Sequence, residues 1–345
     1  MSLNKNKRKQ IIEYMLEKIE NGEKVVKKTQ ETFDITQTTV YRYLNRLISD
    51  GIIIKRRNGY YSIVEKYKNY RYDNENLEED IIYNTDIKPI LESQNLPKNV
   101  MNIWYYAFTE MFNNAIEHSN AEEINCLVIY SYSRISIMIK DNGVGIFDKI
   151  KNYYGYPTVD DAILELFKGK LTTDSENHSG EGIFFTSRLM DIFTATSKNK
   201  YFSHNNHAEM LKTLNDDDRL KKLMEKDNTG TIIMMSIANR SHKEIKEVLD
   251  MFADADNGFN KTSVPMKNVF GNNFPVSRSQ AKRLYFRFDK FNTVELDFKD
   301  VDEVGQAFCH ELFVKFEKQH PNIKIEVVNA NKKVLDMIEH VKNTI

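Results

Sequence analysis

The sequence predicts an α+β protein of several domains, and three observations support this fold class. At about 100–200 residues per domain, a chain of 345 residues is expected to contain two or three domains. Basic residues are concentrated at the N-terminal end. Helical and strand periodicities alternate along the chain and fall into three segments. With 41% hydrophobic and 29% charged residues, the composition is typical of a folded protein rather than a disordered one.

Composition also argues against several classes of protein. Two cysteines, Cys126 and Cys309, are too few for a disulfide framework or a four-ligand zinc site, which favours a reducing compartment. No apolar run approaches the roughly 18 residues of a membrane span, and the N-terminus has no signal-peptide core. We therefore expect a cytoplasmic protein without membrane association. The formal net charge of −1 gives no general argument for a nucleic-acid partner.

The first segment, residues 1–66, has the element order of a winged helix-turn-helix. Helical spacing of apolar residues predicts three helices, which lie over 11–19, 24–33 and 40–47. Two short apolar strands then flank Asn58-Gly59, a pair that predicts a hairpin with a primed turn.

This module carries the residues expected of a DNA-binding surface. Residues 1–66 contain fourteen Lys and Arg against eight Asp and Glu, a net charge of +6. The side chains expected to contact DNA lie on the third helix and at the hairpin tip: Gln37, Thr38, Thr39, Arg42, Lys55, Arg56 and Arg57. Winged helices also serve as protein-interaction or dimerisation modules, but the basic charge favours double-stranded DNA as the partner.

Residues 67–99 are predicted as a linker and lead-in to the next domain. The stretch from Lys66 to about Glu79 alternates tyrosines with basic residues and then becomes acidic. Such side chains are able to contact nucleic acid, but we expect an ordinary interdomain connection.

The strongest chemical signal lies in the middle segment. Glu110 and Asn114 lie four residues apart in a predicted helix, so their side chains share one face. Two strands follow, and the second ends in Asp141-Asn-Gly143-Val-Gly145. An Asn amide oxygen suits Mg²⁺, and a carboxylate one turn away can hold a water as a general base. An Asp at a strand end can accept from an adenine amino group, and the glycines let the backbone approach the base.

With these motifs in this order, residues 100–245 resemble the GHKL ATP-binding superfamily of gyrase B, heat-shock chaperones, histidine kinases and MutL. The helix from Glu110 to His118 resembles the N box, and Asp141–Gly145 resembles the first glycine box. His178-Ser-Gly180-Glu-Gly182 resembles the second glycine box, which leads into a helix whose N-terminal amides would hold phosphate. Thr229-Gly-Thr231 resembles the last box.

The resemblance implies an α/β sandwich that binds ATP with Mg²⁺. By this resemblance Asn114 would hold the Mg²⁺, Glu110 would be the catalytic base, and Asp141 would bind the adenine. Residues 147–179 would form the lid. His118 is expected to pack beside the N box rather than to act. The other residues assigned to ATP binding are Gly143, Gly145, Gly180, Gly182 and Thr231.

Two features depart from the family pattern. The second glycine box has Glu181 where a hydrophobic residue is commoner. No His-Glu/Asp-x-x-x-Pro phosphoacceptor helix is present, so an ordinary histidine kinase would lack its substrate residue. A polar stretch over 198–228 contains His204, His207 and Asp216–Asp218, where we expect a solvated helical insertion in preference to a metal site.

Residues 258–345 are predicted as a small α/β domain. After a helix that Ser277 and Ser279 would cap, the strand–helix–strand–helix order from 293 to 341 predicts a parallel βαβ sheet. The stretch from Val294 resembles the core of STAS anti-sigma antagonists, and most closely the STAS-like domain of unknown function found behind GHKL modules. In antagonists a serine before the glycine takes phosphate. Here Val304 precedes Gly305, which argues against phosphorylation at this position.

Together the three segments predict an ATP-binding, Mg²⁺-dependent regulator that couples nucleotide state to DNA binding, with transcription as the expected setting. One alternative is an anti-sigma-type serine/threonine kinase that acts on a separate STAS or sigma-type partner. Another is an ATPase in which ATP closes a homodimer that acts on DNA or in defence. The sequence alone leaves open whether ATP is hydrolysed, transferred or only bound.

Overall fold

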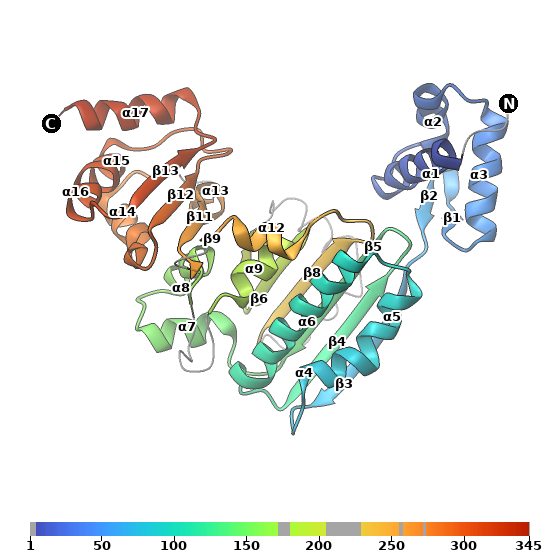
Figure 1. The fold of residues 1–345 in the computed structure, drawn as a ribbon, viewed down its shortest axis with the longest axis horizontal. Coiled ribbons are helices and arrows are strands. Elements are labelled where there is room, and N and C mark those ends of the chain that lie inside the picture. Colours follow the sequence, from blue (N-terminus) through green and yellow to red (C-terminus); the bar gives the residue numbers. More distant parts are fainter. Residues whose placement is uncertain (1–4, 172–179, 205–228, 255–257, 272–273, 345) are drawn as a thin grey trace.

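A computed structural model of the protein describes residues 5–171, 180–204, 229–254, 258–271 and 274–344. The chain has a mixed α+β architecture with several sheets, which confirms the predicted fold class at that level. An N-terminal module and a C-terminal α/β module lie at opposite ends of a central six-stranded sheet with its helices (Figure 1).

The N-terminal module contains three helices and a two-stranded hairpin. Its elements are α1 (Lys5–Glu20), α2 (Val25–Phe33), α3 (Gln37–Ser49), β1 (Ile53–Lys55), the 3₁₀ turn η1 (Arg57–Gly59) and β2 (Tyr61–Ile63). Thr36 caps α3, because its hydroxyl accepts a hydrogen bond from the backbone N–H of Thr39 at 3.3 Å. Asn58 and Gly59 both have positive φ, which confirms the predicted primed turn.

The segment predicted as a linker begins with a strand. Residues Lys66–Asp73 form β3, which pairs antiparallel with β4 (Glu123–Tyr130) at the edge of the central sheet. The hydroxyls of Tyr70 and Tyr72 both reach Asp86, on the side of the sheet that the helices cover. The two tyrosines alternate with charged residues, and these charged residues concealed the strand pattern in the sequence. An edge strand tolerates them because its other face is exposed.

The central sheet is antiparallel throughout, with the strand order β3-β4-β5-β8-β6-β7. Its remaining strands are β5 (Arg134–Asp141), β6 (Ile192–Ser197), β7 (Lys200–Ser203) and β8 (Ile232–Ala238). The strands predicted before Asp141 and after Thr231 are therefore present and adjacent. Because β5 pairs with β8, these two residues, far apart in the sequence, meet at one end of the sheet.

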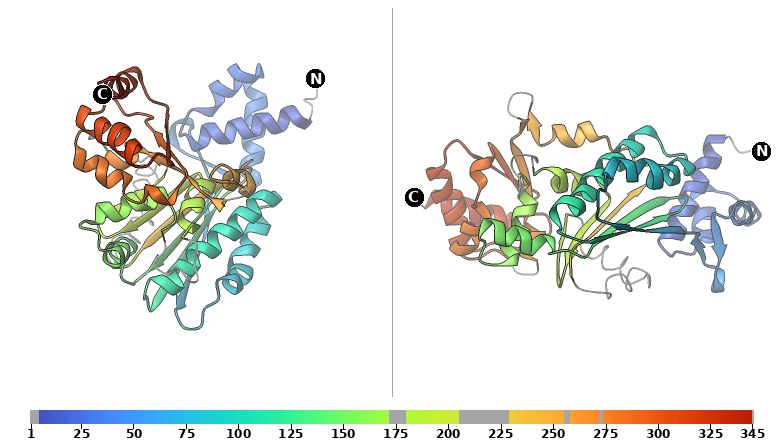
Figure 2. Two further views of the ribbon diagram at one scale, coloured as in Figure 1. Left: turned by 60° about the vertical axis from the view of Figure 1, so that its left-hand side comes forward. Right: turned by 90° about the horizontal axis from the view of Figure 1, so that it is seen from below.

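Helices cover one face of this sheet (Figure 2). The covering elements are α4 (Glu79–Ile82), η2 (Tyr83–Ile87), α5 (Lys88–Ser93), α6 (Lys98–His118), α9 (Gly182–Leu189) and α12 (Ile245–Asp250). The first three form one continuous helix, in which η2 is a π-helical turn. Two further helices, α7 (Ile146–Tyr154) and α8 (Val159–Lys168), follow β5. Trp104, Phe108 and Phe112 of α6 are fully buried, so this helix is the centre of the core.

The C-terminal module contains a parallel sheet in the order β11-β12-β13. The short antiparallel pair β9 (Ala253–Asp254) and β10 (Gly258–Phe259) precedes it. Its elements are then β11 (Lys261–Pro265), α13 (Met266–Phe270), α14 (Arg278–Tyr285), η3 (Phe288–Lys290), β12 (Thr293–Asp297), α15 (Gln306–His310), η4 (Glu311–Phe316), α16 (Glu317–Gln319), β13 (Lys324–Val328) and α17 (Lys332–Asn343). The predicted parallel unit is β12, the helix α15–α16 and β13. Strand β11 was missed, because only Thr262 and Val264 of its five residues are buried.

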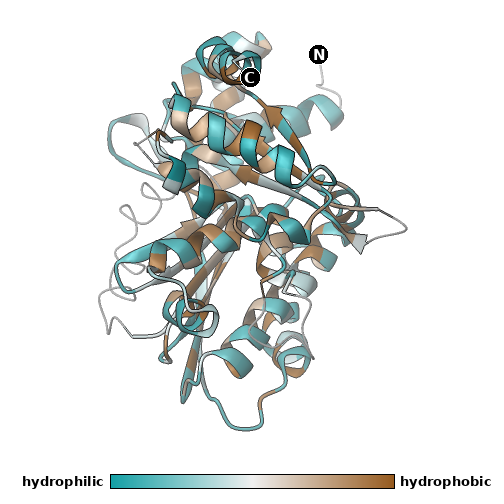
Figure 3. Ribbon diagram, turned by 90° about the vertical axis from the view of Figure 1, so that its left-hand side faces the viewer, coloured by the Kyte–Doolittle hydropathy of each residue, from teal (hydrophilic) through white to brown (hydrophobic). Residues whose placement is uncertain are grey.

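Among the described residues, buried apolar side chains form two large cores, besides a small cluster of Leu127, Ile129 and Met138. One lies within the N-terminal module and includes Ile11, Leu44 and Ile53. The other is continuous from the central sheet into the C-terminal module, and it joins residues such as Phe184 and Phe259. The helices of both sheets have a hydrophobic and a hydrophilic side (Figure 3). The central and C-terminal parts therefore share one core, whereas the N-terminal module has its own.

Candidate functional site

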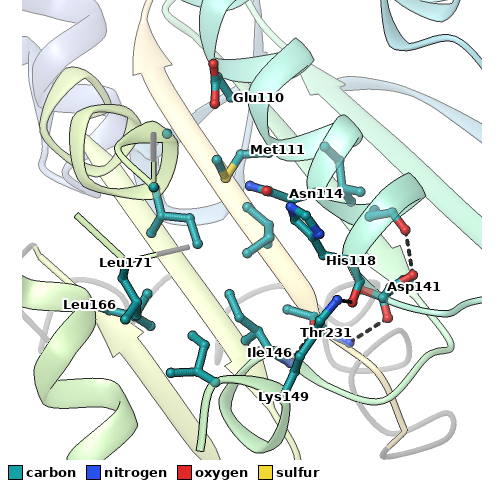
Figure 4. A pocket seen from close by; sticks show the side chains of 18 of the residues that line it. Glu110, Met111, Asn114, His118, Asp141, Ile146, Lys149, Leu166, Leu171 and Thr231 are labelled. Carbon is teal, nitrogen blue, oxygen red and sulfur yellow. Dashed lines mark hydrogen bonds between the residues drawn. The ribbon is translucent and has the colours of Figure 1, made fainter. Parts of the chain in front are cut away.

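A cavity of about 270 Å³ lies between α6, α7, α9 and the adjoining ends of β5 and β8 (Figure 4). It brings together most residues that the sequence assigned to a nucleotide site. Its lining includes Glu110, Asn114, Asp141, Gly145, Gly180, Gly182 and Thr231. Gly143 is next to it, because its backbone N–H donates to Asp141 Oδ1 at 2.9 Å.

Helix α6 supplies one wall of the cavity. Glu110 and Asn114 face it one turn apart, as the spacing predicted, and His118 follows one turn later. Apolar side chains of Met111 and Ala115 lie between them. In Figure 4 Glu110 lies at one end of the cavity and Asp141 at the other, with Asn114 between them. A ligand in this cavity would therefore meet a carboxylate at each end and an amide in the middle.

Asp141 is a buried carboxylate in a fixed orientation. Its Oδ1 accepts hydrogen bonds from the backbone N–H groups of Gly143, at 2.9 Å, and Thr231, at 3.1 Å. Burial raises the pKa of Asp141 above its ordinary value, and these hydrogen bonds oppose the increase only in part. A carboxyl group has about four lone-pair positions, so acceptor capacity is left for a donor in the cavity.

Thr231 connects three elements around Asp141. Its N–H donates to the carboxylate, and its hydroxyl accepts from the N–H of Ile146, the first residue of α7, at 2.9 Å. The hydroxyl therefore satisfies a backbone donor that the start of a helix leaves without an intrahelical acceptor. Thr231 was predicted to bind ATP, and its contact with α7 was not predicted because it joins residues 85 positions apart.

Two glycines allow close approaches that any side chain would prevent. A Cβ at Gly143 would overlap the Ser119 carbonyl oxygen, just after α6. A Cβ at Gly182 would overlap Glu110 Oε2, so this carboxylate lies against the first residue of α9. The first turn of a helix has N–H groups without intrahelical acceptors and a partial positive charge, and that of α9 faces the same end of the cavity as Glu110.

Sequence reasoning missed Lys149 on α7. Its ammonium group donates to the carbonyl oxygen of His118, the last residue of α6, at 2.6 Å, and both residues line the cavity. A cation here satisfies the helix C-terminus and complements its dipole. The available signal was the spacing of four residues from Gly145, which places Lys149 one turn into the helix that follows the first glycine box.

The predicted lid is described only in part. Residues 147–171 contain most of α7 and all of α8, and Leu171 N–H donates to the Gly180 carbonyl at 3.1 Å. Residues 172–179, with His178 of the second glycine box, lie outside the described residues, as do His207 and Asp216–Asp218 of the polar stretch.

The residues predicted to contact DNA lie on α3 and the hairpin, beside each other in the N-terminal module. Six of the seven side chains are exposed: Gln37, Thr38, Arg42, Lys55, Arg56 and Arg57. Thr39 is half-buried, and its hydroxyl lies 3.0 Å from that of Thr36, so it supports the start of α3. Arg56 donates to the Ser62 hydroxyl at 3.0 Å, which ties this side chain to the hairpin.

The described ranges contain neither a candidate metal cluster nor a candidate membrane span. Within them no group of three His, Cys, Asp or Glu side chains is placed to hold a metal ion. No described helix is both long and apolar enough to cross a membrane.

Comparison with known proteins identifies one part of the chain. Residues 280–335 match the family described as STAS-like domain of unknown function (DUF4325). The match runs from α14 through the β12–helix–β13 unit into α17. The C-terminal module therefore contains a STAS-like domain, as the sequence predicted. No curated protein matches the chain.

Proposed function

We propose that the chain is a Mg²⁺-ATP-binding regulator whose N-terminal module binds double-stranded DNA. One observation carries the nucleotide part: a single cavity collects Glu110 and Asn114 of α6 with Asp141 of β5. Its volume, about 270 Å³, is close to the lower end of the range for small-molecule sites, about 300–1,000 Å³.

The chemistry of the cavity fits the groups of ATP. Asp141 offers a fixed, buried acceptor for the adenine amino group. Asn114 offers a neutral oxygen ligand of the kind that Mg²⁺ accepts beside phosphates and water. The first turn of α9 offers backbone donors for phosphate oxygens. Glu110 lies against this turn, where its carboxylate can act as a general base and accept a proton from an attacking water. The resemblance to GHKL proteins assigns the same roles to these residues.

The nucleotide proposal is tested by titrating the purified full chain with a fluorescent ATP analogue, with and without Mg²⁺. We expect wild type to bind, Asn114→Ala to lose the Mg²⁺-dependent part of the affinity, and Glu110→Ala to bind without turnover. Lys200→Met is a matched surface control, because it removes only an exposed ion pair with Asp160. Absence of binding by wild type would refute the nucleotide proposal.

The DNA proposal is supported by the charge of +6 over residues 1–66 and by the six exposed side chains on α3 and the hairpin. Phosphate contacts make affinity depend on salt, with a slope of about −0.9 per neutralised phosphate. We expect binding to mixed-sequence duplex DNA that weakens with salt. Affinity that changes with nucleotide would support a coupled regulator, and complete independence would refute the coupling.

A second candidate function is a protein kinase that acts on a separate STAS protein. The STAS-like domain in this chain favours it, because domains of this type are the substrates of anti-sigma kinases in the family that the sequence resembles. Val304 replaces the acceptor serine, so the acceptor would lie on another chain. Transfer of labelled phosphate to a STAS protein, lost in Glu110→Ala, would distinguish this function from ATP binding alone.

A further inference from the structure

The segment from Glu165 to Leu171 has two sides. Leu166, Gly169 and Leu171 line the cavity. The residues between them, Lys168 and Lys170, contact the C-terminal module instead: Lys168 donates to the Phe286 carbonyl at 2.6 Å, and Lys170 to the Lys290 carbonyl at 2.9 Å. One short segment is thus part of the cavity wall and part of the interface between the modules.

A buried ionic cluster lies at this interface, which also contains part of the shared apolar core. Lys168 is fully buried, and its ammonium lies 2.5 Å from Glu165 Oε1. Arg287, from the C-terminal module, lies 3.8 Å from the second oxygen of Glu165 and donates to the Lys170 carbonyl at 2.9 Å. We call Glu165, Lys168 and Arg287 the buried lock. Burial raises the pKa of Glu165 and lowers that of Lys168, and their mutual attraction opposes both shifts.

Packing around Gly169 is equally close. This glycine has φ +81°, and a Cβ there would lie 2.7 Å from the ring of Phe184 and 2.9 Å from that of Phe259. Phe184 belongs to α9 and lines the cavity, whereas Phe259 belongs to the C-terminal module. Thr262 of β11 adds a hydrogen bond to the Lys168 carbonyl at 2.6 Å. A ligand that displaces Gly169 would therefore also displace the Phe259 ring of the C-terminal module.

Helix α9 makes a second connection. Gly182 and Phe184 at its start line the cavity, while Arg188 at its end reaches the C-terminal module. The Arg188 guanidinium donates to the carbonyl of Ser263 in β11 at 3.0 Å and lies 3.3 Å from the ring centre of Phe184. Both the α8 segment and α9 thus run from the cavity to the same module.

We propose that the C-terminal STAS-like module senses the occupancy of the cavity, and that nucleotide binding and docking of this module through the buried lock stabilise each other. Glu165 and Lys168 lie on one helix and stay paired in any state, so undocking would break the Arg287–Glu165 ion pair and the hydrogen bond from Lys168 to the Phe286 carbonyl. Leaving a buried charge without its partner is very costly, so these contacts are either formed or solvated, which gives two discrete states. A ligand that binds one state better shifts the equilibrium, and the effect is reciprocal. This inference rests on the proposed nucleotide function of the cavity.

The test uses the full chain and the double variant Glu165→Gln/Lys168→Met. Changing both residues leaves no unpaired charge of this pair, and Arg287, which loses its ion pair with Glu165, keeps its hydrogen bond to the Lys170 carbonyl. We expect affinity for Mg²⁺-ATP to fall roughly tenfold, within the 5- to 150-fold range typical of such coupling. In wild type, nucleotide should slow the proteolytic release of the C-terminal module, and in the variant this protection should disappear.

Two further variants keep the test decisive. Lys170→Met removes a half-buried contact of the same interface and should lower ATP affinity less than the double variant does. It provides the test if the double variant fails to fold. Lys342→Met breaks the exposed pair with Glu317 inside the C-terminal module and should change neither readout. Absence of ATP binding by wild type would overturn the proposed function and this inference with it. Normal binding by all folded variants, with an unchanged protease pattern, would overturn only the inference.

Discussion

Replacement of Asp141 by Asn separates the structural role of this side chain from its proposed role in binding. The carboxylate accepts hydrogen bonds from the N–H groups of Gly143 and Thr231 through Oδ1, and the Thr231 hydroxyl also donates to it. An amide oxygen can accept both N–H hydrogen bonds, whereas the amide NH₂ cannot accept from an adenine amino group. Asp141→Asn should therefore keep the fold and remove the hydrogen bond to the base.

The magnitude follows from these hydrogen bonds. Burial raises the pKa of Asp141, so the charged form is disfavoured in the fold, and removing the charge should leave stability unchanged or slightly higher. A hydrogen bond to a charged group contributes about 1.5–3 kcal/mol, which corresponds to a loss of roughly 10- to 150-fold in ATP affinity. Asp141→Ala should also lose stability, about 1–3 kcal/mol for each of the two N–H groups left unpaired.

The assay combines thermal unfolding with titration of a fluorescent ATP analogue. Asp160→Asn is the control, since Asp160 is an exposed carboxylate on the first turn of α8 whose ion pair is with Lys200, at the protein surface. An unfolding temperature of Asp141→Asn far below that of wild type, or ATP binding as tight as that of wild type, would contradict the roles assigned to Asp141.

Three further predictions concern the same site and the N-terminal module. Gly182→Ala should fold normally but abolish any ATP turnover, because the new methyl group displaces the Glu110 carboxylate; steady-state phosphate release checks this, and unchanged turnover would contradict it. ATP affinity should fall as pH decreases through the raised pKa of Asp141, since the hydrogen bond to adenine needs the carboxylate. This decline should begin above the ordinary Asp pKa of about 3.9 and be absent in Asp141→Asn. ATP titrations at several pH values measure it. The triple variant Lys55→Ala/Arg56→Ala/Arg57→Ala should weaken binding to all DNA sequences and reduce the salt slope by about 0.9 for each phosphate that the variant no longer neutralises, measured by fluorescence anisotropy; an unchanged slope would exclude the hairpin tip from the interface.

Local patterns account for the parts of the structure that were predicted well. The helical spacing of Glu110 and Asn114 places both on one face, and the structure has both in the cavity wall. Asn58-Gly59 is a turn signal whose geometry depends on a few neighbouring residues, and the turn occurs as expected. The alternating strand before Asp141 is β5.

The parts that were missed depend on distant partners. Strand β3 has a charged sequence that becomes a strand only because β4 offers it an edge and Asp86 accepts its tyrosine hydroxyls. The spacing of Lys149 from Gly145 did not reveal its partner, because that partner is a carbonyl at the end of another helix. The burial of Lys168 was equally unpredictable, since lysines are usually exposed and its partners include a carbonyl more than a hundred residues away.

The sequence by itself indicated the order of the modules, the side chains that line the cavity, and local turns, because these follow from residue type and short spacing. Only the tertiary structure decided that Asp141 and Thr231 meet, that Gly182 admits Glu110, and that the STAS-like module shares a core with the cavity wall. Such contacts join residues far apart in the chain. Their energies come from burial and from hydrogen bonds that exist only once the whole chain has packed.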